Sequence, residues 1–97
     1  MAGHIDAKPE ELREQALKIQ NLAEDIGRMI SDYDGIIGFL GSSWKGASNS
    51  AYIEKYEERK PFLLNMQEET EGFSNMLKQY ANNVEENDNT MASQIRG

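Results

Sequence analysis

The chain has 97 residues, of which 17 are acidic and 10 are basic, so its formal net charge is −7. This length allows one domain at most. The acidic balance argues against binding to nucleic acid or to anionic membrane surfaces, because both need clustered lysine and arginine. The absence of cysteine excludes disulfides, zinc–thiolate sites and a cysteine nucleophile.

The N-terminal segment has no basic stretch followed by an apolar one, so we expect no cleaved signal peptide. The longest mostly apolar run, residues 36–40, is far shorter than the ~20 residues of a membrane-spanning helix. We therefore expect no stable membrane insertion. Composition alone favours a soluble, cytosolic protein.

Apolar residues in the first part of the chain recur with gaps that alternate between four and three. They are Leu12, Ala16, Ile19, Ala23, Ile26, Ile30, Tyr33, Ile37 and Leu40. Such spacing is typical of a helix that packs lengthwise on another helix. Leu22, Met29 and Ile36 form a third row, which suits contact with more than one helix. Pro9 fits a first helical turn, so the pattern predicts a helix over about residues 9–40.

The periodicity stops at Gly41-Ser42-Ser43-Trp44-Lys45-Gly46, which predicts a turn over 41–46. It then returns, again with gaps of four and three, and predicts a second helix over about 47–85. Its seam is Tyr52, Tyr56, Arg59, Leu63, Met66, Thr70, Phe73, Leu77, Tyr80, Val84, Asn87 and Met91. Pro61 lies inside this helix and cannot donate to the helical ladder, so we expect a kink near residues 57–61.

These elements predict an all-α fold, an antiparallel helical hairpin in which helix, turn and helix form one domain over residues 1–97. Two helices alone leave wide apolar stripes uncovered, so we expect two chains to form a four-helix bundle. The residues expected in the hairpin and dimer core are Leu12, Ile19, Ile26, Ile30, Tyr33, Ile37, Tyr56, Leu63, Met66, Phe73 and Leu77.

The sequence offers no convincing catalytic, cofactor-binding or metal-binding group. Its one histidine, His4, stands alone near the N-terminus, and a catalytic histidine needs a rigid position and an orienting partner. Serines 42, 43, 48 and 50 have no base nearby. Adjacent carboxylates such as Glu57 and Glu58 diverge on a helix, and so they read as a solvated face. We expect a non-enzymatic protein without a cofactor or a metal.

Trp44 in the expected turn is the one unusual feature, since it is the only tryptophan. An indole at this place can close the open end of the helix pair, where Gly46 permits a tight backbone. It can also serve as an aromatic anchor for a partner. The sequence leaves both readings open.

A hundred-residue chain with a central Trp44-Lys45-Gly46 turn between two helices resembles the WXG family of ESAT-like (early secreted antigenic target) proteins. Pro9-Glu10-Glu11-Leu12, at the start of the first helix, is similar to many members. Tyr56-Glu57, Pro61 and the ending Ser93-Gln94-Ile95-Arg96-Gly97 are similar to the Bacillus-type branch. The resemblance covers the whole chain.

This resemblance implies export by the type VII (ESX-type) secretion system of a Gram-positive bacterium, as a folded dimer without a cleaved signal peptide. It implies a C-terminal signal, over residues 84–97, that an FtsK/SpoIIIE-type ATPase reads. In actinobacterial members this signal is Tyr-x-x-x-Asp/Glu, and this sequence lacks it, because Val84 and not an acid stands four residues after Tyr80. A looser form of the signal is a hydrophobic residue, an acid four residues later and then two hydrophobic residues. Its four positions are matched by Val84, Asp88, Met91 and Ile95. In family dimers the turn of one chain lies near the C-terminal end of its partner, so Trp44, Lys45 and Gly46 belong to the implied signal.

The resemblance further implies a secreted substrate and virulence-type factor that also serves as a co-export partner. Self-sufficient seams favour a homodimer, while a heterodimer with a paired small Trp-x-Gly protein stays open. Two alternatives from other classes also stay open. One is a membrane-active effector, which amphipathic helices would permit, and the other is a cytosolic helical adaptor or chaperone.

Overall fold

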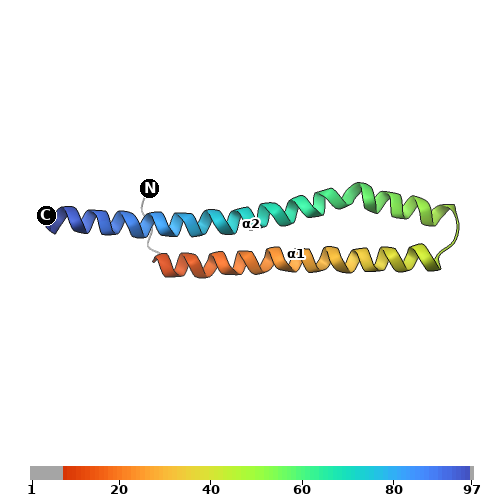
Figure 1. The fold of residues 1–97 in the computed structure, drawn as a ribbon, viewed down its shortest axis with the longest axis horizontal. Coiled ribbons are helices and arrows are strands. Elements are labelled where there is room, and N and C mark those ends of the chain that lie inside the picture. The colour runs from red at the N-terminus through yellow and green to blue at the C-terminus, as the bar shows by residue number, and fades with distance from the viewer. Residues whose placement is uncertain (1–7, 97) are drawn as a thin grey trace.

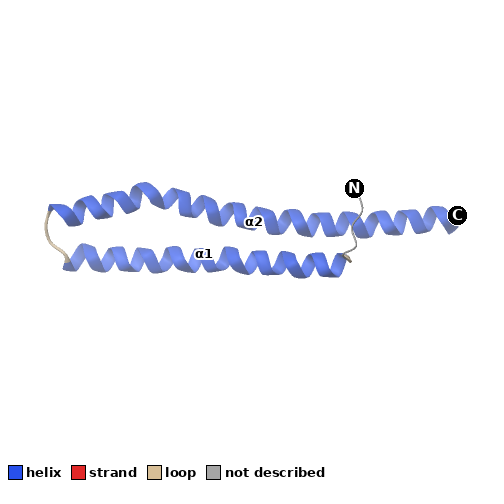
Figure 2. Cartoon of the chain, turned by 180° about the vertical axis from the view of Figure 1, so that it is seen from behind, coloured by secondary structure: helices blue, strands red, loops and turns tan. Residues whose placement is uncertain are grey.

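A computed structural model describes residues 8–96 of the chain, and the side chains of residues 8–86. This part of the chain contains two helices and no strand: α1 spans Pro9–Ser43 and α2 spans Ala47–Arg96. Figure 1 shows the two helices side by side and antiparallel, joined by one short turn, and Figure 2 shows the same hairpin from behind. The predicted all-α helical hairpin is confirmed.

The turn is shorter than the expected segment 41–46. Helix α1 continues through Gly41 to Ser43, so Trp44, Lys45 and Gly46 alone connect the helices. Gly41 does not end the helix. Among the described residues the positive φ, of 125°, is at Gly46. A glycine costs a helix only about 1 kcal/mol relative to alanine. The reversal therefore takes place at Gly46, where a side chain would be strained.

Helix α2 is longer than the expected 47–85 and continues to Arg96. No glycine or proline interrupts the chain between residues 73 and 96, so nothing in the backbone stops the helix there. At 1.5 Å per residue its length accounts for the 76 Å long axis of the molecule. Because α1 begins only at Pro9, the last part of α2 extends beyond it as a single helix (Figure 1).

The expected kink lies in a helix that remains continuous through Pro61. Figure 1 shows α2 bending in its green segment, on the side of the helix that is nearer the turn, whereas α1 runs nearly straight. Proline lacks the N–H that would bond to the carbonyl one turn earlier, so the bend has a local cause.

Small side chains form the best-buried contact between the two helices. Ala16, Ala23, Ile30 and Ile37 of α1, each seven residues after the last, are buried. From α2, Ser74 and Ala81 are buried against them, and the Ser74 hydroxyl donates a 2.7 Å hydrogen bond to the Ala16 carbonyl. Alanine and serine let the backbones of packed helices approach closely, and the buried Ala16, Ala23, Ser74 and Ala81 all lie in the half of the hairpin away from the turn.

Only one of the two rows of residues in the expected α2 seam packs on α1. The expected members Tyr56, Leu63, Thr70, Leu77 and Val84 are indeed half-buried against α1. The row beside them is not the expected Tyr52, Arg59, Met66, Phe73 and Tyr80, but Ile53, Lys60, Gln67, Ser74 and Ala81, all of which are buried or half-buried.

The expected core residues consequently divide into two groups in the single chain. Ile30 and Ile37 are buried, and the half-buried ones are Leu12, Ile19, Ile26, Tyr56, Leu63 and Leu77. Tyr33, Met66 and Phe73 remain exposed. The larger residues are left outside because the helices meet through small side chains and not through the widest apolar rows.

Candidate functional site

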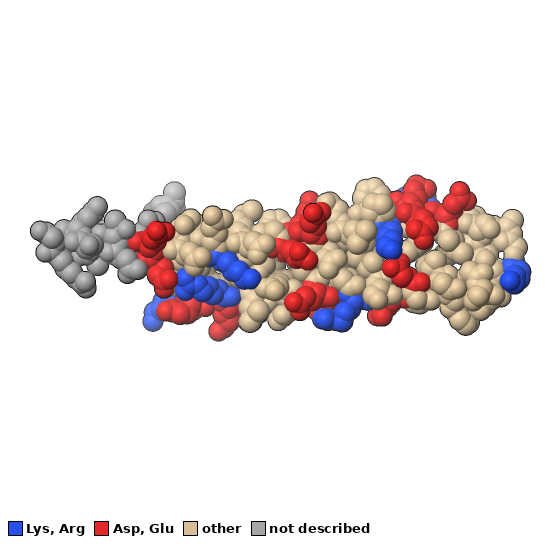
Figure 3. Space-filling view, viewed as in Figure 1, with Lys and Arg blue, Asp and Glu red and all other residues tan. Residues whose placement is uncertain are grey.

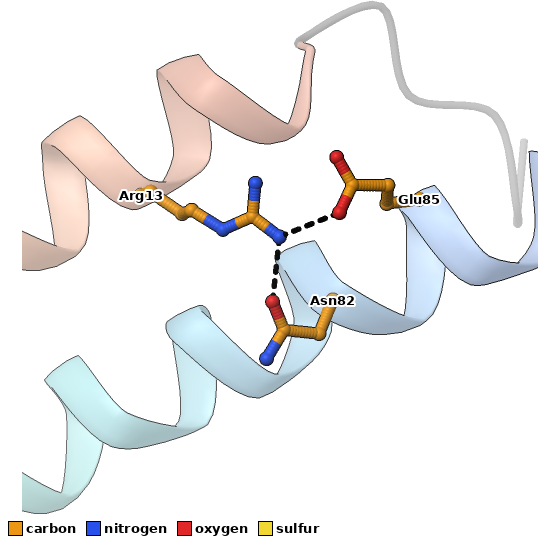
Figure 4. Close-up of polar contacts among 3 residues, drawn as sticks. All are labelled: Arg13, Asn82 and Glu85. Carbon is orange, nitrogen blue, oxygen red and sulfur yellow. Dashed lines mark hydrogen bonds and ion pairs between the residues drawn. The ribbon is translucent and has the colours of Figure 1, made fainter.

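One long edge of the hairpin is closed by polar contacts between the helices. Near the start of α1, the Arg13 guanidinium donates to Asn82 Oδ1 at 2.6 Å and to Glu85 Oε1 at 3.0 Å (Figure 4). Seven residues later, Gln20 Oε1 accepts a 2.8 Å hydrogen bond from Lys78 Nζ. We call this side of the molecule the polar edge.

The polar edge continues towards the turn. A Cβ atom added at Gly27 would lie 2.6 Å from the Gln67 amide nitrogen, so the glutamine side chain occupies that space. Seven residues on, Asp34 accepts hydrogen bonds from the Tyr56 hydroxyl and from Lys60 Nζ, both at 2.9 Å. Arg13, Gln20, Gly27 and Asp34 thus repeat with a period of seven along one side of α1, and they hold the two helices in register.

The ionisable groups of this edge respond to their partners. The hydrogen bond from Lys60, followed by that from Tyr56, lowers the pKa of Asp34. Burial, followed by the hydrogen bond to Asp34, raises the pKa of Tyr56 to about 12. At the other end, the hydrogen bond from Arg13 lowers the pKa of Glu85. Each shift favours the protonation state that keeps the helices paired.

The opposite edge of the hairpin is apolar and uncovered. We call it the open edge, and it consists of Leu22, Met29 and Ile36 from α1 with Tyr52, Phe62, Met66, Phe73, Met76 and Tyr80 from α2. Phe62, Phe73 and Met76 are 68 %, 60 % and 64 % exposed. Scattered apolar side chains are common on protein surfaces, but rows of large apolar side chains that repeat along a helix pair mark an interaction surface.

Two shallow hollows lie along the open edge. One, of about 370 Å³, is lined by Ile19, Phe73, Met76, Leu77 and Tyr80. The other, of about 350 Å³ and nearer the turn, is lined by Tyr33, Tyr52, Lys55, Tyr56, Arg59, Phe62 and Leu63. Figure 3 shows charged groups gathered in separate clusters on the face that it presents, with uncharged surface between them. Hollows framed by large apolar side chains can receive the side chains of another helix.

The turn places Trp44 against the first turns of α2. Its ring centroid lies 6.0 Å from that of Tyr52, and 37 % of the residue is exposed. The Trp44 N–H donates to the Leu40 carbonyl at 2.9 Å and closes the end of α1. Lys45 and Gly46 are exposed. Trp44 therefore packs beside Tyr52 at the turn end of the hairpin, and part of the residue remains exposed.

The expected C-terminal signal lies mostly outside the described side chains. Val84 is half-buried on the face of α2 that meets α1. Asp88, Met91 and Ile95 belong to the helical backbone of α2, but their side chains are outside the described residues. In the sequence they stand on the part of α2 that extends beyond the start of α1.

The described residues contain no group of three or more histidine, cysteine, aspartate or glutamate side chains placed to hold a metal ion. None of the helices, over the same residues, is both long and apolar enough to cross a membrane. His4 lies outside the described residues.

Periodicity in single helices did not reveal the polar edge. Its members are charged or polar and belong to different helices, so each looks like a solvated residue when its own helix is read alone. The regular spacing of Arg13, Gln20 and Asp34 was the available signal. Phe62 and Met76 were also missed as members of the open edge, although Phe62, Glu69 and Met76 stand seven residues apart.

Comparison with known proteins agrees with this arrangement. The family described as "Proteins of 100 residues with WXG" matches residues 4–89. Protein YukE of Bacillus subtilis is 35 % identical over 97 residues, which is the full length of both chains. An uncharacterised protein of Clostridium acetobutylicum is 29 % identical over 84 residues, 87 % of this chain and 88 % of that one.

Among solved structures, Geobacillus thermodenitrificans EsxA in crystal form I superposes with a TM-score of 0.83 and 32 % sequence identity. The match covers 94 % of this chain and the whole of that one. The turn residues Trp44, Lys45 and Gly46 fall inside the part that the family description matches. The chain therefore belongs to the ESAT-like WXG family of hundred-residue proteins, in its Bacillus-type branch.

Proposed function

We propose that this protein is a non-enzymatic substrate of a type VII secretion system, exported as a folded homodimer. The observation that carries the proposal is the open edge, a stripe of exposed apolar side chains along the whole hairpin of a chain that belongs to the ESAT-like WXG family. In the proposed dimer, the open edges of two chains face each other and form a four-helix bundle.

The energetics favour association along this edge. Large side chains such as Phe73 and Met76 gain roughly 25 cal/mol per Å² of apolar surface removed from water. The polar edge already uses its groups within one chain, at Arg13–Glu85 and Asp34–Lys60, so it offers less to a partner. A second copy provides the same apolar rows, because a two-fold interface matches a surface with itself.

Export requires a recognition surface besides the dimer. The turn offers the partly exposed Trp44 with Lys45 and Gly46, and the resemblance assigns recognition by an FtsK/SpoIIIE-type ATPase to Val84, Asp88, Met91 and Ile95. A helix that presents an apolar stripe with one carboxylate suits a receptor groove. We propose that the turn of one chain and the C-terminal segment of the other form this signal together.

The protein would then leave the cell without a cleaved signal peptide. It would act outside as a virulence-type factor and support the export of other substrates. A paired small Trp-x-Gly protein could replace the second copy, and this heterodimer is the competing assembly. Neither role requires catalysis, a cofactor, a metal, nucleic acid or membrane insertion.

Export is tested in a strain with an intact secretion locus, by comparing cell and culture-supernatant fractions. We expect the unaltered protein in the supernatant. The Trp44→Ala variant, and separately a chain that lacks residues 84–97, should form helical dimers inside the cell and be absent from the supernatant. Ser43→Ala, at the exposed last residue of α1 beside the turn, controls for altering this end of the hairpin as such, and circular dichroism verifies that each variant folds.

Three outcomes would contradict the proposal. Normal secretion of both altered chains would show that neither Trp44 nor residues 84–97 act as the export signal. Retention of the unaltered protein in the cell would favour the cytosolic adaptor or chaperone. Leakage of dye from liposomes at micromolar protein would favour the membrane-active effector.

A further inference from the structure

Arg59 is the exception in an otherwise apolar row of the open edge. Its neighbours in that row, at intervals of seven, are Tyr52, Met66, Phe73 and Tyr80. The arginine lines the hollow near the turn together with the side chains of Tyr33 and Phe62. A guanidinium that is covered by apolar groups loses its hydration, so it needs a carboxylate from whatever covers it.

Glu69 is the acidic counterpart on the same edge. It stands seven residues from Phe62 and from Met76, which line the two hollows, so it lies between them on the outer row of the open edge. Within the two α2 rows that form this edge, Glu69 is the acidic residue. The salt bridges among the described side chains involve neither Arg59 nor Glu69.

We propose that the second copy supplies the missing partners: Arg59 of each chain pairs with Glu69 of the other and fixes the register of an antiparallel homodimer. This inference rests on the proposed self-association and goes beyond it, because it selects one register and favours a second copy over a different protein. Polar residues at otherwise apolar positions of a helix interface are a common device for such selection. The planar arginine fork suits a carboxylate particularly well.

The spacing of the two residues agrees with the shape of the hairpin. If α2 lies antiparallel to the partner's α2, the two-fold axis crosses midway between Arg59 and Glu69, level with Leu64. Gly27 faces Gln67 across the hairpin, so this level lies close to Ile30 of α1. That is about one helical turn from the middle of Pro9–Ser43. The two open edges consequently overlap along nearly their whole length.

The same register has a consequence for the turn. Residues at equal distances on either side of Leu64 come level with each other, so Trp44 lies level with the partner's Val84. The two symmetric Arg59–Glu69 pairs would therefore also align the two parts of the composite export signal that is proposed above.

Charge reversal tests the pair. Arg59→Glu alone, or Glu69→Arg alone, places like charges at both symmetric contacts and should weaken self-association by about tenfold to a hundredfold. Combining Arg59→Glu with Glu69→Arg in one chain restores opposite charges and should restore the dimer. Mixing the two single variants should give a heterodimer that forms in preference to either homodimer, as measured by native mass spectrometry.

Matched controls separate the pair from the change in net charge. Arg28→Glu and Glu68→Arg change the charge by the same amounts at exposed positions away from the open edge, and their mixture should show no preference. The register proposal is overturned if the unaltered chain is a dimer while the Arg59→Glu and Glu69→Arg variants mix at random. An unaltered chain that stays monomeric overturns the proposed homodimer itself, so the two failures are distinguishable.

Discussion

The carboxylate of Asp34 in α1 accepts a 2.9 Å hydrogen bond from the Tyr56 hydroxyl in α2. The same carboxylate holds Lys60, and the Tyr56 ring lies 5.7 Å from that of Tyr33. This contact joins the helices on the turn side of Pro61, in the bent half of α2 (Figure 1). In the other half, the buried Ala16, Ala23, Ser74 and Ala81 hold the helices together.

Asp34→Asn should loosen the turn half of the hairpin without loosening the other half. The amide cannot hold Lys60 as an ion, and the described α2 residues between 50 and 73 include none that is fully buried. We expect hydrogen exchange to become faster over residues 47–60 and to stay unchanged over 74–85. Asp32→Asn, at an exposed position, is the matched control. Uniform acceleration along both helices would contradict this division.

The pKa of Tyr56 gives a pH dependence. Its pKa is raised from 10.0 to about 12 by burial and by the hydrogen bond to Asp34. Because the folded state favours the protonated phenol, this contribution to stability is complete below pH 10 and is lost as the pH rises towards 12. Tyr56→Phe should remove this part of the alkaline destabilisation, as measured by denaturant unfolding at several pH values. An unchanged alkaline profile would contradict the assignment.

Asp34 gives the opposite dependence in acid. Its pKa lies below the ordinary value of 3.8, because Lys60 and Tyr56 donate to the carboxylate. The stabilisation is therefore complete above the unfolded pKa and is lost as the pH falls through the folded one. Asp34→Asn should flatten the acid limb of the unfolding profile. Asp32→Asn serves again as the control, and equal flattening by both variants would show that Asp34 has no special role.

Two glycine substitutions should have opposite effects. Gly46 has a φ of 125°, a backbone conformation that residues with a side chain rarely adopt, although an added Cβ would meet no neighbouring atom. Gly46→Ala should therefore destabilise the chain by about 1–2 kcal/mol. Gly35 lies in α1 with open space around it, so Gly35→Ala should stabilise by about 0.5–1 kcal/mol. Thermal unfolding of both variants shows whether each substitution stabilises or destabilises the chain. An unchanged stability of Gly46→Ala would contradict the need for a glycine at this φ.

The sequence predicted the architecture better than the packing between the helices. The alternating gaps from Leu12 to Leu40 predicted α1 and its apolar stripe, because a period of 3.5 residues arises within one helix. The rows of α2 were predicted only by half. Lys60, Gln67 and Ser74 read as surface residues in their own helix, and only the opposite helix turns them into packing or hydrogen-bonding partners.

The ends of the helices were also predicted imperfectly, for a local reason. Gly41 reads as a helix terminator, yet α1 continues to Ser43, and the positive φ that a glycine permits is found at Gly46. The asparagines at 82 and 83 favoured an early end of α2, but Asn82 accepts a hydrogen bond from Arg13 of α1 within a helix that continues to Arg96. Tertiary contacts override such modest propensities.

Sedimentation equilibrium tests most directly whether the open edge binds a second copy of the chain. At micromolar concentration we predict a particle of twice the 11.0 kDa of one chain. Phe73 is 60 % exposed in the single chain, and a second copy would cover it. Phe73→Glu should give a helical monomer, because the dimer would bury an unpaired carboxylate at this position. The matched Gln79→Glu, at an exposed position of α2 outside the open edge, should remain dimeric. A monomeric unaltered chain, or a Phe73→Glu variant as dimeric as the parent, would contradict the account.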